Sequence, residues 1–162
     1  MKSLISYLNE SQNKEYVDIF VVYNDKILFL RRANYIRQFG GKWCLPGGTL
    51  EKGEDQKEAI IRELKEETNI SVKDVQLWRH WTYSNNSKTS IYTVILDNEP
   101  EIKISREHAQ YKWLNVDELE KYKEKMAGEL WSIVQEKFLS GKIHNDLNRG
   151  VWKHLKHFCL KN

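Results

Sequence analysis

The chain has 162 residues, of which 40% are hydrophobic and 30% charged. That length and composition are typical of one globular domain with its own core, and they exclude fibrous and low-complexity proteins. The formal net charge of +3 is compatible with anionic ligands but is too small to indicate nucleic-acid binding by itself. No apolar run is long enough to cross a membrane, and the N-terminus lacks a secretory apolar stretch. The two cysteines, Cys44 and Cys159, lie far apart, so we expect a cytoplasmic protein with free thiols.

The first half of the chain predicts a hairpin, a glycine-containing loop and a helix, after a polar lead-in at 1–14. Runs of β-branched and aromatic residues indicate strands, and the pair Asn24-Asp25 indicates the turn of a hairpin. The clearest helix is expected at 54–68, because Ile60 and Leu64 fall on one side of it. The strands of this half are predicted at 17–23 and 26–31, with a short extended piece at 43–45.

The second half predicts further strands and then helices. Strands are expected at 72–83, 89–96 and 111–114, with a turn at 84–87. Asp117 is expected to cap a helix through Lys125, and another helix is marked by Leu130 to Phe138 and stopped by Gly141. A final helix is predicted from the apolar positions Val151, Trp152, Leu155 and Phe158. This order predicts a mixed sheet with helices on both faces, in a single domain 1–162 whose C-terminal helical extension spans 120–162.

Three carboxylates form one patch on the helix at 54–68. Glu63, Glu66 and Glu67 are spaced i, i+3 and i+4, so they point the same way. Like charges so close together are tolerated most easily around a cation, and carboxylate oxygens suit hard ions such as Mg²⁺ or Mn²⁺. The alternative is a solvated acidic face partnered by Arg62 and Lys65, which is the commoner meaning of such a triplet taken alone.

A glycine pair precedes this helix, in the segment Trp43-Cys-Leu-Pro46-Gly47-Gly48. Glycine permits positive φ and a close approach of the backbone to a ligand. A backbone carbonyl from this segment could therefore join the carboxylates around a metal ion. An ordinary turn is the alternative interpretation.

Together, these residues resemble the Nudix box. Gly48 is followed by five residues and Glu54, and seven residues later comes Arg62-Glu-Leu-Lys-Glu-Glu-Thr-Asn-Ile70. Every defined position agrees with the family pattern except Asn69, where the family has glycine. That position follows the helix, where a left-handed conformation is expected and asparagine is the next most tolerated residue.

The resemblance, which extends from Val17 to about Leu119, implies an α/β fold, the Nudix α/β/α sandwich with a mixed sheet. It also implies a hydrolase that uses Mg²⁺, or else Mn²⁺, to cleave a phosphoanhydride bond in a nucleoside diphosphate-linked substrate. By position, the family's metal ligands fall on Glu66 and Glu67, with Glu63 as a ligand or as the general base. The implied supporting residues are Gly48, through its carbonyl, and Glu54 and Arg62, which would orient the carboxylates.

Further site residues are implied outside the box. Glu107 resembles a family loop glutamate that joins the metals or takes the proton of water, and a solvated loop acid is the alternative. His108 beside it is expected to be exposed or structural, and a role as a base is the alternative. Arg32 resembles a family arginine that reaches substrate phosphate, and a solvent-exposed strand end is the alternative. Trp81 and Tyr83, which flank the Asn-rich turn, are candidates to stack on a base, although core packing is the more common role.

The sequence indicates the type of reaction more specifically than it indicates the substrate. ADP-ribose-cleaving relatives often carry a proline after the box where Asn85-Asn86 stands here, and the pattern of NADH-cleaving relatives is missing, so we favour nucleoside triphosphates. Alternatives are an ADP-ribose or nucleotide-sugar pyrophosphatase, a nucleotide-binding regulator, or an RNA-end hydrolase. A regulator would typically lack box acids, which are all present here. An RNA-end hydrolase would need a broader basic surface than this sequence indicates. The expected partner is a small nucleotide, without membrane or nucleic acid, and a homodimer is left open.

Overall fold

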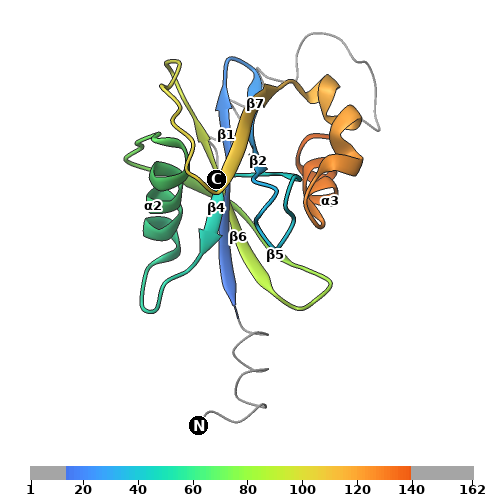
Figure 1. Cartoon of the computed structure of the whole chain (residues 1–162). Coiled ribbons are helices and arrows are strands. Elements are labelled where there is room, and N and C mark those ends of the chain that lie inside the picture. The colour runs from blue at the N-terminus through green and yellow to red at the C-terminus, as the bar shows by residue number, and fades with distance from the viewer. Residues whose placement is uncertain (1–13, 140–162) are drawn as a thin grey trace.

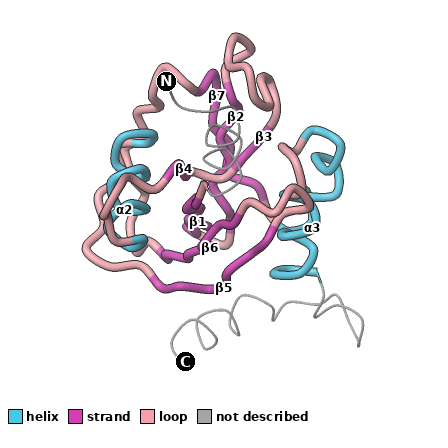
Figure 2. Tube along the Cα trace, turned by 90° about the horizontal axis from the view of Figure 1, so that it is seen from below, coloured by secondary structure: helices cyan, strands magenta, loops and turns pink. Residues whose placement is uncertain are grey.

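The computed structural model describes residues 14–139, which form a mixed sheet between two layers of helix (Figure 1). The predicted α/β/α sandwich is therefore confirmed (Figure 2). No helix in this part of the chain is both long and apolar enough to cross a membrane. The lead-in, the predicted helix at Val151 to Phe158, its basic residues and Cys159 lie outside the described residues.

Strand β1 is the centre of the sheet. It pairs in parallel with β6 along its whole length, whereas its other edge pairs with β2 at the hairpin turn and with β4 at its beginning. The strands follow the order β3-β2-β1-β6-β5, with β7 beside β2. Their bounds are β1 Glu15–Tyr23, β2 Lys26–Arg32, β3 Trp43–Cys44, β4 Gly47–Thr49, β5 Gln76–Thr82, β6 Lys88–Ile95 and β7 His108–Leu114.

Alternation along β1 divides the core between the two faces of the sheet. Val17, Ile19 and Val21 pack on the side of α2, whereas Phe20 and Val22 pack on the side of α3. All five are buried. Because successive side chains of a strand point to opposite faces, a strand buried on both sides is apolar at both sets of positions. Asp18 is a polar exception within this run.

Helix α2 (Gln56–Thr68) covers one face of the sheet. It begins two residues later than predicted, because the Asp55 side chain accepts hydrogen bonds from the amides of Lys57 and Glu58 and so acts as the N-cap. It ends at Thr68, and the C-cap Asn69 has a φ of 65°, the left-handed conformation expected there. Helix α2 thereby places the three box acids beside β1 and β4.

The opposite face is covered by η1 (Val116–Lys125, a 3₁₀-helix), α3 (Leu130–Val134) and the π-helical turn η2 (Gln135–Leu139). The prediction that Asp117 caps the first of these was wrong. Asn115 is the N-cap, and its amide donates to the Glu118 carboxylate at 2.9 Å. Strand β5 was also predicted too long, since it begins at Gln76 rather than at residue 72.

Candidate active site

Pairing with β1 places the glycine pair of β4 against helix α2. Gly47 lies opposite Asp18, and Gly48 lies opposite Val17. A Cβ atom added to Gly48 would overlap the carboxyl group of Glu63 on α2. Glycine is therefore needed at this position, because a side chain would push the Glu63 carboxylate away from the loop.

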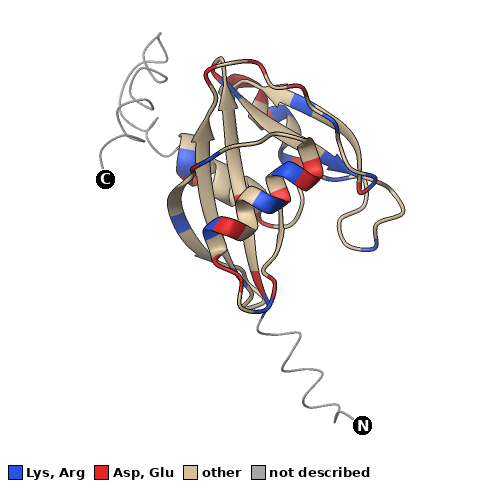
Figure 3. Ribbon diagram, turned by 90° about the vertical axis from the view of Figure 1, so that its left-hand side faces the viewer, with Lys and Arg blue, Asp and Glu red and all other residues tan. Residues whose placement is uncertain are grey.

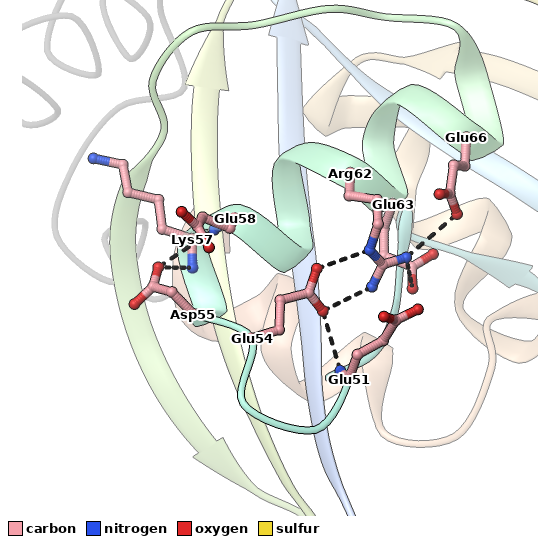
Figure 4. A network of polar contacts seen from close by, with 8 residues as sticks. All are labelled: Glu51, Glu54, Asp55, Lys57, Glu58, Arg62, Glu63 and Glu66. Atoms are coloured by element: carbon pink, nitrogen blue, oxygen red, sulfur yellow. Dashed lines mark hydrogen bonds and ion pairs between the residues drawn. The ribbon is translucent and has the colours of Figure 1, made fainter.

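Arg62 connects the acidic residues of the box (Figure 4). Its guanidinium donates to both oxygens of Glu54, with Nε–Oε1 at 2.8 Å and Nη2–Oε2 at 3.0 Å. Nη1 also donates to Glu63 at 3.0 Å and to Glu66 at 3.3 Å. The paired hydrogen bond from Arg62 is the main cause that lowers the pKa of Glu54. Figure 3, which looks onto α2, shows acidic and basic residues alternating along its outer side.

Glu67 lies deeper than the other box acids. Its carboxylate accepts a hydrogen bond from the Gly47 amide at 2.9 Å, and His108 Nε2 lies 3.6 Å from its other oxygen. Burial, reinforced by the Glu63 and Glu107 carboxylates, raises the pKa of Glu67 to about 8. Burial also lowers the pKa of His108 to about 4, which keeps its imidazole neutral at pH 7. His108 is buried, so the prediction that it could be exposed was wrong.

A cavity of about 600 Å³ is lined by residues from both layers of helix, including those of α2 and α3. Its acidic end contains Glu63, Glu67 and Glu107, together with Arg32. Elsewhere its lining combines apolar and aromatic residues, such as Phe39, Leu45 and Tyr83, with polar ones, such as Asp18, Ser84 and Glu129. A pocket that combines apolar walls with several polar and charged groups suits a small polar molecule.

A sequence model of the NUDIX domain matches residues 13–136. The chain belongs to the NUDIX family of hydrolases. It is 32% identical over 97 residues to the nucleoside triphosphatase NudI of Escherichia coli O139:H28 (strain E24377A / ETEC), covering 52% of this chain and 69% of the relative.

Solved structures share the Nudix fold. A bifunctional NMN adenylyltransferase/ADP ribose pyrophosphatase from Francisella tularensis, complexed with AMP and a manganese ion, has a TM-score of 0.69 and 26% identity. That match covers 82% of this chain but 44% of the bifunctional protein, so this chain spans less than half of it. A MutT protein from Methanosarcina mazei Go1 has a TM-score of 0.66 and 23% identity, covering 82% and 96% of the two chains.

Most of the Nudix site residues predicted from the sequence gather around the cavity. Gly48, Glu63, Glu67, Glu107, Arg32 and Tyr83 line it. Glu54, Arg62 and Glu66 lie behind or beside them in the network of Arg62. Trp81 was predicted to contact the substrate base, but among the described residues it does not line the cavity. Its side chain packs against the apolar cluster on the side of α3.

The donor set of the Nudix box fits a divalent cation. Glu63, Glu66 and Glu67 offer only carboxylate oxygens, and burial raises the pKa values of Glu63 and Glu67, a cost that a nearby cation would offset. In residues 14–139, no group of three His, Cys, Asp or Glu side chains converges closely enough to hold a metal. Arg62 and the Gly47 amide instead hold the carboxylates separately, so metal binding would require these side chains to turn toward one another.

Sequence reasoning missed three charged or aromatic residues of the cavity lining. Asp18, Phe39 and Glu129 line it, and Glu129 accepts a hydrogen bond from the Ser84 amide at 2.7 Å, which fixes the turn between β5 and β6 at the cavity wall. Of these residues, only Asp18 could have been identified from the sequence. A carboxylate within a strand that is apolar on both sides is costly to bury, which indicates a functional role.

Proposed function

We propose that this Nudix hydrolase is a Mg²⁺-dependent pyrophosphohydrolase that prefers nucleoside or deoxynucleoside triphosphates. The observation that carries the proposal is a cavity whose lining includes the box acids Glu63 and Glu67 together with aromatic side chains such as Phe39 and Tyr83. A triphosphate placed at the acidic end would leave its nucleoside against the aromatic walls. The similarity to the nucleoside triphosphatase NudI supports this class of substrate.

Glu63, Glu66 and Glu67, with the Gly48 carbonyl, would hold the cation, which we expect to be Mg²⁺ or Mn²⁺. When bound, such a cation would neutralise phosphate charge and make water more acidic. Arg62 would keep Glu63 and Glu66 in position through its hydrogen bonds, while Glu54 holds Arg62. The Gly47 amide does the same for Glu67.

We assign proton acceptance to Glu107. Its exposed carboxylate lines the acidic end of the cavity and has no hydrogen-bonding or ionic partner in the described chain, whereas Glu63 and Glu67 are both held. In the reaction, the water oxygen bonds to phosphorus, the phosphorus–oxygen bridge breaks, and the water proton passes to Glu107. Arg32, whose buried Nε has no partner in the described chain, would donate to a phosphate oxygen.

ADP-ribose or a nucleotide sugar is the second candidate substrate. The likeness to the ADP ribose pyrophosphatase of Francisella tularensis favours it, and a cavity of about 600 Å³ is within the usual range for small-molecule sites. A nucleotide-binding regulator is disfavoured, because all the box acids are present. A cytoplasmic location and a homodimer remain predictions.

The test is hydrolysis with Mg²⁺ over ribo- and deoxyribonucleoside triphosphates, oxidised triphosphates, dinucleoside polyphosphates, ADP-ribose, NADH and nucleotide sugars. We expect kcat/KM for the best triphosphate to exceed that for ADP-ribose by about tenfold or more, with a monophosphate and pyrophosphate as products. A reversed preference, with AMP and ribose phosphate as products, would select the second candidate. No hydrolysis of any compound would overturn the proposed function.

A further inference from the structure

Asp18 brings a carboxylate from outside the Nudix box into the lining of the same cavity. Its Oδ2 atom accepts a hydrogen bond from the Thr89 hydroxyl at 2.7 Å and is 3.5 Å from the Tyr83 hydroxyl, which donates to it. A Cβ atom at Gly47 would come within 2.8 Å of Oδ1, so glycine leaves this second oxygen uncovered. No described residue donates a hydrogen bond to Oδ1.

The fold does not require this charge. No lysine, arginine or histidine among residues 14–139 forms an ion pair with Asp18. Burial raises the pKa of Asp18 to about 6, against the smaller opposing effects of its two hydrogen bonds, so the ionised side chain costs stability. An asparagine oxygen would accept the same two hydrogen bonds without that cost. A costly carboxylate facing a ligand-sized cavity points to a ligand that donates a hydrogen bond.

The surroundings of Asp18 identify the kind of group it would meet. Tyr16, Phe39 and Tyr83 line the same cavity, and Phe39 is 44% exposed. Aromatic side chains with a polar group beside them suit a flat heterocycle, which packs on the rings and presents its edge to the polar group. A carboxylate accepts hydrogen bonds but donates none, so it favours an N–H donor and repels a carbonyl oxygen in the same place.

We propose that Asp18 determines base specificity by accepting a hydrogen bond from an exocyclic amino group of the substrate's nucleobase. The inference rests on the proposed function, since it assumes that the cavity holds a nucleotide. Cytosine and adenine carry an amino group where uracil and hypoxanthine carry a carbonyl. The enzyme should therefore discriminate within the pairs CTP/UTP and ATP/ITP. Sites built to pair with a donor reject the analogue that lacks it, because their own polar group is then left unpaired.

The experiment compares wild type with Asp18→Asn, whose amide can donate to a carbonyl oxygen, and with Thr89→Val, which removes the hydrogen bond that orients the carboxylate. Glu15→Gln is the control, since Glu15 is an acid on the same strand but lies outside the cavity lining. Two quantities are measured for each variant. The first is kcat/KM for the four triphosphates, and the second is the binding constant of CMP, UMP, AMP and IMP by calorimetry, which needs no turnover.

We expect wild type and Glu15→Gln to favour the amino base by about tenfold or more in at least one pair. Asp18→Asn should reduce that ratio to within about twofold or reverse it, and Thr89→Val should reduce it in the same direction. If wild type has equal kcat/KM for the two members of each pair, or if the ratio is unchanged in Asp18→Asn, the proposed role of Asp18 is wrong. Selective monophosphate binding without any triphosphate hydrolysis would instead overturn the proposed function while supporting the role of Asp18.

Discussion

Gly48 and Glu63 lie so close together that the helix carboxylate occupies the space of the missing side chain. A Cβ atom at Gly48 would overlap the carboxyl carbon and both carboxyl oxygens of Glu63. The overlapping atoms are the far end of a flexible side chain, so the Glu63 carboxylate can move away while the backbone stays in place. The consequence of adding a methyl group there should therefore appear in activity more than in stability.

Gly48→Ala is the direct test of this contact. We expect kcat to fall by about tenfold or more, because a displaced Glu63 carboxylate could no longer turn toward the other box acids to share a cation, whereas the melting temperature should change little. Gly53→Ala is the control. Gly53 has φ of 82° and open space around its Cβ position, so alanine there is strained but touches nothing in the site. That variant should lose stability and keep its activity, and an equal loss of activity in both variants would contradict the prediction.

Glu67→Gln should remove nearly all turnover and leave the fold intact. Glutamine keeps the shape and can still accept the hydrogen bond from the Gly47 amide. Because burial raises the pKa of Glu67 to about 8, a neutral side chain at this position does not destabilise the fold. The melting temperature should therefore be equal or higher. Losing a charged ligand should cost about a hundredfold or more in kcat.

Glu58→Gln is the matched control for that variant. Glu58 is an exposed acid of the same helix, and it lies outside the cavity lining (Figure 4). It should turn over like wild type. If Glu67→Gln works within a few-fold of wild type, or if Glu58→Gln is equally inactive, the metal site has been assigned to the wrong face of α2.

Metal removal should abolish activity, and Mg²⁺ or Mn²⁺ should restore it, because the candidate ligands are oxygen donors. A second measurement does not depend on turnover. Added Mg²⁺ should raise the melting temperature of wild type, since a ligand that binds only the folded state stabilises it, and the rise should be smaller in Glu67→Gln. Full activity in a metal-stripped sample would reject the mechanism.

The box could be predicted from the sequence because its geometry is local. Glu63 and Glu67 are one helical turn apart, so their common direction follows from the helix period alone. The left-handed Asn69 followed in the same way from its position after the helix. Helix and strand ends were less certain, and Asn115 rather than Asp117 is the cap of η1 because two polar residues close together compete for that position.

The part of the cavity around Asp18 could not be predicted, because it depends on contacts between distant parts of the chain. Asp18 meets Thr89 across the parallel pair β1–β6, although 71 residues separate them. Glu129 reaches Ser84 from the other face of the sheet. A strand's periodicity shows which residues share a face, but it does not show which strand will lie beside it. The position of Trp81, in the apolar cluster rather than the cavity lining, has the same origin.

Because the ionised Asp18 side chain is costly to bury, we expect wild type and Asp18→Asn to differ in stability by an amount that depends on pH. Folding raises the pKa of Asp18 from its ordinary value of 3.8 to about 6. Between these pH values the folded protein binds more protons than the unfolded chain, so the free energy of unfolding falls as the pH rises. The penalty is complete above about pH 6 and absent below about pH 4. The pKa difference corresponds to about 3 kcal/mol at most, and to less where solvent screens the half-buried carboxylate.

Asp18→Asn has no such titration, so it should be more stable than wild type at pH 8 by about 1–3 kcal/mol. The difference should shrink as the pH falls from 6 to 4. Denaturant unfolding of both proteins at intervals from pH 4 to pH 8 measures it. Glu67 and His108 also have shifted pKa values, but they are present in both proteins, and their effects cancel in the comparison. A difference that stays constant with pH, or an asparagine variant that is less stable at pH 8, would show that the ionised Asp18 carries no cost in the folded protein.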